Sequence, residues 1–290
     1  MNVSSSSIPT VCSILLLEGN VGSGKTSIAR VLHAHSRCKL LREEIGDRLL
    51  QLFYANTERY AFTLQLVMQS TRLWQLRNAC ATTACTMVTL DRSVLGDYVF
   101  ALWNWATGDI SDDEFDVYRE RAGYGVCDAL YRAIGDRNSK DTRITIVYLR
   151  DTPEQCHARV VDRDQADSTM TLEYARGVHA MYELCVAIAA ARQHVSTPYR
   201  VVTHNWHEYA HIAAEPSSRS STPLLLPEHN AVVDEFIQSI SYTGSVVAHP
   251  LSVDDALTNI NTSGVLEKCI KNTAQVFDAA FGSFPESYYT

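Results

Sequence analysis

The sequence has few lysines, and it lacks the patterns of several protein classes. Only five of its 25 basic residues are lysine, and the formal net charge of −8 argues against a general nucleic-acid-binding protein. The eight cysteines form no C-x-x-C pair and no zinc-binding spacing, so we expect free thiols in a reducing, cytoplasmic compartment. No apolar run is long enough to span a membrane, and no signal peptide is recognisable. We therefore expect neither a nucleic acid nor a membrane as partner.

The chain does contain enough apolar material for a substantial core. It has 290 residues, of which 46% are hydrophobic, a composition typical of a globular protein. A stretch rich in proline, serine and threonine at 215–228 indicates a linker. We therefore divide the chain into a flexible tail at 1–10, a main domain at 11–214, the linker, and a C-terminal extension at 229–290 of unknown role.

One eight-residue stretch is typical of a phosphate-binding loop. It reads G-x-x-x-x-G-K-T, behind an apolar run and before a helical pattern. Its glycines let the backbone wrap closely around a polyphosphate, whose oxygens then face backbone N–H groups at a helix N-terminus. The residues assigned to this loop, and through it to ATP, are Gly19, Asn20, Val21, Gly22, Ser23, Gly24, Lys25 and Thr26. We expect Lys25 to reach the transferred phosphate and Thr26 to hold Mg²⁺.

Five apolar stretches predict β-strands that alternate with helices. The strands are expected at 14–17, 39–44, 86–90, 143–149 and 199–203. The helices are expected after the phosphate loop, from residue 49, over 61–84, after capping residues at 111 and 152, and over 172–189. This alternation predicts an α/β protein of P-loop kinase fold, with a five-stranded parallel sheet and helices on both faces. Beyond the linker, an amphipathic helix is expected near 232–240 and a further cap at 252.

Three motifs fall at the ends of predicted parallel strands. The phosphate loop follows the first strand, Glu43 ends the second, and Asp91 and Arg92 end the third. Ligands of such sheets bind at the carboxyl ends of the strands, so we expect these groups to form one site. An acid directly after an apolar strand is the usual second magnesium-binding element of loop-type kinases, which predicts a metal ligand at Asp91.

These motifs, in this order, resemble the deoxyribonucleoside kinases of the deoxycytidine, deoxyguanosine and mitochondrial thymidine kinase group. The resemblance covers roughly residues 14–203, and its blocks are 18–26, 40–43, 64–65, 91–93, 148–154 and 172–174. It implies transfer of the γ-phosphate of ATP, with Mg²⁺, to the 5′-hydroxyl of a deoxyribonucleoside in nucleotide salvage. It also implies a nucleoside kinase domain at 11–214 and a homodimer, with the helix at 61–84 as candidate interface. The unusual tail suggests a viral member.

The resemblance implies roles for residues around the phosphates. Glu43 matches the catalytic carboxylate beside the 5′-hydroxyl. Relatives have proline at the next position, whereas Glu44 follows here, so Glu44 remains an alternative base. Arg92 matches the arginine that pairs with the catalytic carboxylate and the phosphate. Arg159 and Arg163 match arginines of the lid over the phosphates, in a lid that is one residue shorter here.

The resemblance also implies residues that bind the nucleoside. Gln65 matches the amide that makes paired hydrogen bonds to the base, and Phe100 matches the ring that stacks on it. Tyr54 and Asp167 match the pair that holds the sugar 3′-hydroxyl.

Base preference is expected to depend on Arg72 and Asp97. They fall where deoxycytidine-type members carry an arginine and an aspartate beside the exocyclic group of the base. This favours deoxycytidine, with purines as further substrates. A one-residue deletion after Asp97 leaves a broader specificity that includes thymidine open.

Two alternative functions remain open. A nucleoside-monophosphate kinase of the thymidylate type also places Asp-Arg after the third strand, but its acceptor site binds a monophosphate. A nucleotide-binding regulatory module without catalysis would also use the phosphate loop. A GTPase would need an Asn-Lys-x-Asp motif, and the sequence has none.

Overall fold

The computed structural model describes residues 13–35, 38–82, 87–122, 143–162, 169–192, 199–205, 236 and 263–281. The expected tail, linker and cap at 252 lie outside the described residues, and of the helix expected near 232–240 only Phe236, which is helical, lies within them. The division of the chain into these segments stays a prediction.

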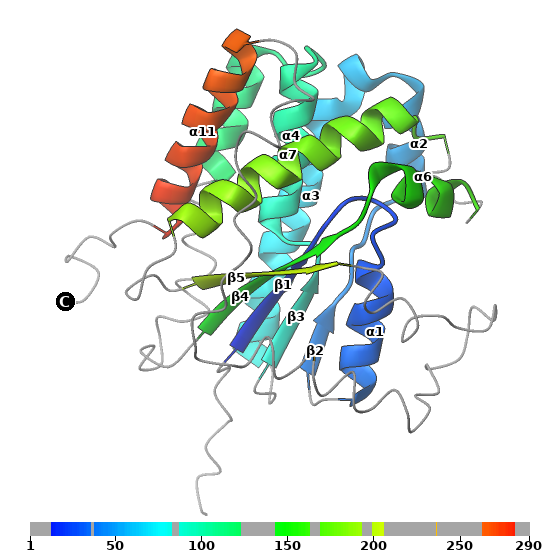
Figure 1. The fold of residues 1–290 in the computed structure, drawn as a ribbon, viewed down its shortest axis with the longest axis vertical. Coiled ribbons are helices and arrows are strands. Elements are labelled where there is room, and N and C mark those ends of the chain that lie inside the picture. The colour runs from blue at the N-terminus through cyan, green and yellow to red at the C-terminus, as the bar shows by residue number, and fades with distance from the viewer. Residues whose placement is uncertain are drawn as a thin grey trace, which may run out of the picture.

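The described residues contain one sheet, in which all strand pairs are parallel (Figure 1). Its strands are β1 (Ser13–Glu18), β2 (Cys38–Leu41), β3 (Met87–Asp91), β4 (Arg143–Arg150) and β5 (Tyr199–Asn205), in the order β2-β3-β1-β4-β5. The predicted five-stranded parallel sheet is therefore confirmed. The second strand is shorter than predicted, because its last pair with β3 joins Leu41 to Leu90. Glu43 consequently lies in the loop that follows β2.

Helices follow the strands in the predicted alternation. They are α1 (Lys25–His35), α2 (Asp47–Ala55), α3 (Thr57–Thr82), α4 (Val94–Ala106), a helix at 112–122, α6 (Pro153–Val161), α7 (Leu172–Ala191) and α11 (Ser263–Phe281). The predicted caps are confirmed: Ser111 and Glu114 form a reciprocal capping box, and the Thr152 side chain accepts a hydrogen bond from the Gln155 N–H.

The sheet has a hydrophobic core on each face, because successive side chains of a strand point to opposite faces. Leu15 and Leu17 pack with the apolar side of α1. Ile14 and Leu16, the alternate residues of the same strand, pack with residues of α3, α4 and α7. Helices therefore cover both faces of the sheet, as predicted, and the larger helical layer lies on the face opposite α1.

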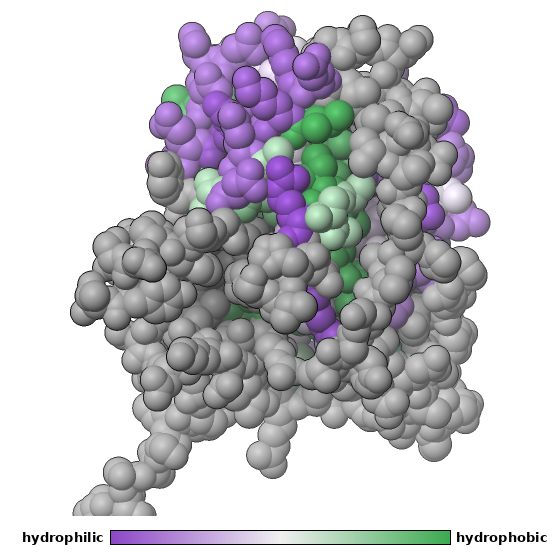
Figure 2. All heavy atoms as spheres, turned by 60° about the vertical axis from the view of Figure 1, so that its left-hand side comes forward, coloured by the Kyte–Doolittle hydropathy of each residue, from purple (hydrophilic) through white to green (hydrophobic). Residues whose placement is uncertain are grey.

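Helix α11 belongs to this larger layer, and the sequence analysis did not predict it. It lies against α7 and α4 (Figure 1). Cys269 and Phe277 are buried, and the Thr273 hydroxyl lies 3.2 Å from the Tyr98 hydroxyl of α4. On this side of the molecule, Figure 2 shows hydrophilic residues gathered at the upper left and a strip of hydrophobic residues beside and below them. Part of the C-terminal extension thus packs directly on the helices that carry candidate site residues.

None of the described helices is both long and apolar enough to cross a bilayer. The helix expected to form a homodimer interface, α3, does have apolar side chains at its surface: Trp74 is 64% exposed and Val67 is 45% exposed. The homodimer stays a prediction.

We expect Phe277→Ala to lower the free energy of unfolding by about 3 kcal/mol, because it leaves a cavity between α11 and the helical layer. Urea denaturation of the full chain measures this change. Lys271→Ala, at an exposed position of the same helix, controls for the loss of a side chain from α11. Equal stability of the two variants would contradict the packing of α11 on this layer.

Candidate active site

The site lies where β1 and β3 end side by side. Leu17 pairs with Asp91, and the Arg92 N–H donates to the Leu17 carbonyl oxygen at 3.0 Å. The helices that follow these two strands, α1 and α4, pack on opposite faces of the sheet. In open parallel sheets this arrangement leaves a crevice at the carboxyl ends of the two strands. The structure therefore brings the phosphate loop, Glu43, Asp91 and Arg92 to one edge, as the sequence predicted.

The phosphate loop has the backbone conformation that its glycines permit. Gly19, Gly22 and Gly24 have φ angles of 146°, 81° and 87°. A Cβ atom at Gly22 would lie 2.2 Å from the Cys156 carbonyl oxygen of α6. Gly22 is thus required both for its left-handed conformation and for the close approach of α6.

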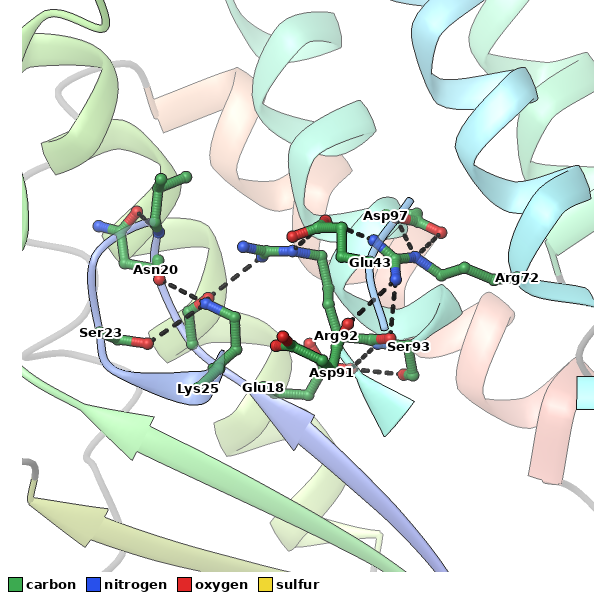
Figure 3. A network of polar contacts seen from close by, with 12 residues as sticks. Glu18, Asn20, Ser23, Lys25, Glu43, Arg72, Asp91, Arg92, Ser93 and Asp97 are labelled. Atoms are coloured by element: carbon green, nitrogen blue, oxygen red, sulfur yellow. Dashed lines mark hydrogen bonds and ion pairs between the residues drawn. The ribbon is translucent and has the colours of Figure 1, made fainter. Parts of the chain in front are cut away.

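Lys25 turns into the loop that precedes it. Its Nζ donates to the carbonyl oxygens of Gly19 and Asn20, at 2.8 and 2.6 Å, and to the Ser23 Oγ at 3.3 Å (Figure 3). Burial, together with the positive charge of Arg92, lowers the pKa of the Lys25 ammonium to about 7. The lysine therefore lies inside the loop, among the groups that the motif assigns to phosphate binding.

Arg159 is the predicted lid arginine that the structure describes. Its Nε donates to the Gly22 carbonyl oxygen at 2.7 Å, and its Nη2 pairs with the Asp151 carboxylate. It therefore lies directly beside the phosphate loop. The other predicted lid arginine, Arg163, and the predicted sugar ligand, Asp167, lie outside the described residues.

The Glu43 carboxylate lies between two guanidinium groups (Figure 3). Arg72 Nη2 donates to its Oε1 at 2.6 Å, and Arg92 Nε donates to the same oxygen at 3.0 Å. Burial alone would raise the pKa of this carboxyl, but the charges of Arg92, Arg72 and Lys25 together lower the pKa to about 2. The alternative base, Glu44, is exposed and makes none of these contacts. The geometry thus favours Glu43.

Arg92 connects the two halves of the site. It has a φ of 70°, which a residue other than glycine rarely adopts. Its Nη1 donates to the Gly19 carbonyl oxygen at 3.1 Å and to the Tyr182 hydroxyl at 2.6 Å. Its guanidinium carbon lies 4.7 Å from the centre of the Phe100 ring, a cation–π contact. Arg92 therefore reaches both the phosphate loop and the aromatic residue assigned to the base.

Arg72 and Asp97, which the sequence pairs for base selection, are in direct contact. Arg72 Nε lies 2.8 and 2.7 Å from the two carboxylate oxygens of Asp97, and both side chains are buried. Burial raises the pKa of Asp97 to about 6, against the lowering effect of Arg72. The remaining Arg72 nitrogens donate to Glu43 and to the carbonyl oxygens of Asp91 and Arg92. Arg72 therefore links Glu43, the catalytic candidate, to Asp97, the candidate for base selection.

A pocket opens beside Glu43 and extends between the helices. It has about 520 Å³ of free space, including the part that is open to solvent. Its lining contains most of the predicted nucleoside ligands: Tyr54, Gln65, Asp97 and Phe100. It also contains residues to which the sequence analysis assigned no role in nucleoside binding: Val21, Ile45, Leu50, Phe53, Leu64, Met68 and Tyr174. Among these, Leu64 and Met68 flank Gln65 at helical spacing on α3, a signal that marks them only as a buried face.

The chain matches a family model described as deoxynucleoside kinase over residues 15–211. The chain belongs to the deoxynucleoside kinase family. This finding confirms the resemblance that the motifs indicated.

Individual family members are more distant. A deoxyguanosine kinase of Lactobacillus acidophilus is 35% identical over 108 residues, which are 37% of this chain and 46% of that protein. Deoxycytidine kinase 2 of Gallus gallus is 26% identical over 196 residues, covering 58% of this chain and 71% of the relative. The mitochondrial thymidine kinase 2 of Homo sapiens is 26% identical over 180 residues, covering 59% of this chain and 63% of that protein. The chain thus spans less than half of the bacterial relative that it matches.

A solved structure shows the same fold. The deoxyadenosine kinase of M. mycoides with dCMP and dCDP bound has a TM-score of 0.50 and 19% identity to this chain, covering 66% of it and 89% of the neighbour. The P-loop kinase fold that the sequence predicted is therefore confirmed for this family member.

The lowered pKa of Lys25 predicts a pH-dependent stability. Between pH 7 and about 10.5 the unfolded chain binds a proton at Lys25 that the folded chain has released, so stability rises with pH in this window. Lys25→Met removes this dependence. We expect the free energy of unfolding of the native chain, relative to the variant, to increase from pH 7.5 to 9.5 in urea titrations. Lys39→Met, at an exposed lysine of β2, controls for the loss of a lysine. A constant difference would contradict a buried, deprotonating Lys25.

Proposed function

We propose that the protein transfers the γ-phosphate of ATP to the 5′-hydroxyl of a deoxyribonucleoside and so produces the monophosphate for nucleotide salvage. The observation that carries this proposal is the position of Glu43. Its carboxylate lines the pocket that contains Gln65 and Phe100, and Arg92 joins it to the phosphate loop. A hydroxyl in that pocket has a carboxylate on one side and a phosphate-binding loop on the other.

Glu43 acts on the 5′-hydroxyl as a hydrogen-bond acceptor that orients the attacking oxygen. Its pKa of about 2 keeps it ionised at neutral pH, so its oxygens can accept a hydrogen bond from the 5′-hydroxyl. In a loose transition state the proton leaves the attacking hydroxyl only late. A weakly basic carboxylate can therefore act as its acceptor if the carboxylate is well placed. Arg72 and Arg92 hold it in that place.

The donor half of the site fits a magnesium–nucleotide complex. Lys25 lies within the phosphate loop, and Arg159 lies beside it. Asp91 is 2% exposed, and its Oδ1 has no hydrogen-bond partner among the described residues, as expected of an oxygen kept for a cation. Thr26 is the second residue of α1 and is exposed. Mg²⁺ usually takes few protein ligands besides phosphates and water, so Thr26 and Asp91 would suffice to hold it, and the bound ion would neutralise part of the phosphate charge.

The acceptor half fits a deoxyribonucleoside. Gln65 is buried at the pocket wall, and none of the described residues is hydrogen bonded to its amide, which leaves it available to a base. Phe100 supports stacking, and Tyr54 with Asp167 is assigned to the sugar. Asp97 in the wall, paired with Arg72, favours deoxycytidine, and acceptance of thymidine stays open.

A nucleoside-monophosphate kinase is the main alternative, and it would need cations for the phosphate of its acceptor. Arg92 is the one cationic side chain in the described lining of the pocket, and it is already bonded to Glu43, Gly19 and Tyr182. This favours the nucleoside. A panel of the four deoxynucleosides and their monophosphates with ATP and Mg²⁺, scored by kcat/KM, tests it. Turnover of monophosphates alone would refute the proposal, and ATP binding without any turnover would favour the regulatory module.

We expect Glu43→Gln to lower kcat for every accepted deoxynucleoside by about 100- to 10,000-fold, because the amide is a poorer acceptor for the hydroxyl proton. Steady-state kinetics with saturating ATP measure this. Glu44→Gln is the matched control and should retain activity, since Glu44 is exposed. The reverse result would transfer the catalytic role to Glu44.

Gln65→Leu should raise KM for the deoxynucleoside about tenfold or more and leave KM for ATP within about twofold. The change removes both hydrogen-bonding groups of the amide and keeps its approximate size. Gln51→Leu, at an exposed position of α2, is the control. If KM for the nucleoside did not change, Gln65 would have no role in reading the base.

A further inference from the structure

Two buried polar residues next to the site have no part in the reaction proposed above. Glu18 ends β1, directly before the phosphate loop, and Tyr182 lies in the middle of α7. Both are fully buried, with exposures of 0%. The Tyr182 hydroxyl accepts a hydrogen bond from Arg92 Nη1 at 2.6 Å and donates one to Glu18 Oε2 at 3.2 Å. The hydroxyl therefore joins a buried carboxylate to the arginine that contacts Glu43.

Glu18 and the Tyr182 ring are each held in place by further contacts. The other oxygen of Glu18, Oε1, accepts hydrogen bonds from the Ser93 N–H at 2.9 Å and from the Ser93 hydroxyl, at the start of α4. The Tyr182 ring stacks on Tyr148, with centres 5.7 Å apart, and meets the edge of Phe100 at 6.3 Å. The ring thus has little freedom to move its hydroxyl away from Arg92.

The packing at Gly96 shows how closely these groups are assembled. A Cβ atom at Gly96, in the first turn of α4, would lie 2.5 Å from Arg92 Cγ, 2.6 Å from Glu18 Oε2 and 2.8 Å from the Tyr182 hydroxyl. No side chain fits there without moving one of the three. The absence of a side chain at residue 96 therefore allows Glu18, Tyr182 and Arg92 to meet.

We propose that Tyr182 and Glu18 are positioning residues, which hold the Arg92 guanidinium in the orientation that Arg92 needs to orient Glu43. Without the hydroxyl, Arg92 Nη1 keeps only the Gly19 carbonyl oxygen. Its backbone φ of 70° is a strained conformation that persists only where surrounding contacts hold the residue, and the Tyr182 hydroxyl is one of these contacts. The predicted effect on catalysis rests on the proposed function. The predicted effect on the Arg92 side chain does not depend on it.

A second buried tyrosine on the same face of the sheet offers a matched control. The Tyr148 hydroxyl donates to Glu183 Oε1 at 2.7 Å, so this pair also joins a buried tyrosine to a buried glutamate. Neither Tyr148 nor Glu183 is bonded to Arg92 in the described structure. If buried tyrosine–glutamate pairs serve only stability, removal of either hydroxyl should have the same consequences.

The test compares Tyr182→Phe with Tyr148→Phe in the full chain. Each change removes one hydroxyl and keeps the ring. We expect Tyr182→Phe to lower kcat about tenfold to hundredfold and to keep KM for the deoxynucleoside and for ATP within about threefold. The change removes the hydrogen bond from Arg92 to the hydroxyl and so loosens the hydrogen bond from Arg92 to Glu43. Tyr148→Phe should keep kcat within about twofold. If Tyr182 had only a structural role, the two variants would lower kcat alike, or Tyr182→Phe would change KM through misfolding.

A second measurement needs no substrate. The Nε–H of Arg92, which donates to Glu43, should exchange slowly with solvent in the native chain, because Arg92 is 5% exposed. In ¹⁵N-arginine-labelled protein this signal is assigned by its loss in Arg92→Lys. We expect exchange at least about tenfold faster in Tyr182→Phe than in the native chain, and native-like exchange in Tyr148→Phe.

Glu18→Gln provides a second route if Tyr182→Phe does not fold. The Ser93 N–H keeps the amide oxygen on its side, so the amide NH₂ faces Tyr182 and the hydroxyl can no longer donate there. We expect the same direction of change in kcat and in Arg92 exchange.

Native-like kcat and exchange in Tyr182→Phe, or in Glu18→Gln where Tyr182→Phe does not fold, would overturn the proposal. If the native chain phosphorylated no deoxynucleoside while Tyr182→Phe still accelerated Arg92 exchange, the proposed function would fall and the positioning role would stand.

Discussion

Two arginines, Arg72 and Arg92, lie almost fully buried at the carboxyl end of the sheet, and a buried guanidinium is costly unless it is paired. Glu43 bonds to both, and Asp97 pairs with Arg72. Glu43 comes from the loop after β2, Arg72 from α3, Arg92 from the residue after β3, and Asp97 from α4, so the pairing of charges holds four separate segments together. The same contacts keep Glu43 ionised and oriented. The arrangement of the site thus follows from how the protein compensates two buried positive charges.

The proposed active site has a donor half and an acceptor half with different structural origins. The donor half is built on one continuous strand–loop–helix, β1 to α1, whose glycine conformations are local. The acceptor half is assembled from α2, α3, α4 and α7, which meet only because their apolar sides share one face of the sheet. Arg92 lies at the junction of the two halves and contacts both. Catalysis of phosphoryl transfer depends mainly on such positioning, so the junction is where small displacements should matter most.

How far the sequence could predict these features depends on the range of the interactions involved. The strands and the caps at Ser111 and Thr152 depend on neighbouring residues, and their prediction was confirmed. The glycines of the phosphate loop have the positive φ angles that its motif requires, while phosphate binding by the loop stays a prediction. The end of β2 was wrong by a few residues, because it depends on where β3 stops pairing. Helix α11 was missed, although Cys269, Val276 and Phe277 have helical spacing, since no motif drew attention to the extension. Tyr182 lies within the helix predicted over 172–189, and the sequence analysis assigned it no role.

The sequence by itself therefore determined the phosphate loop, the parallel α/β architecture and the family, because each rests on local patterns or on motifs in a fixed order. Tertiary structure alone decided that Glu43 and not Glu44 faces the two arginines, since adjacent residues differ in burial only through what packs on them. It also decided that Arg72 reaches Glu43 as well as Asp97, and that Tyr182 meets Glu18 across 164 positions of the chain. Such contacts depend on how α3, α4 and α7 pack on the sheet, and no spacing along the chain encodes that directly.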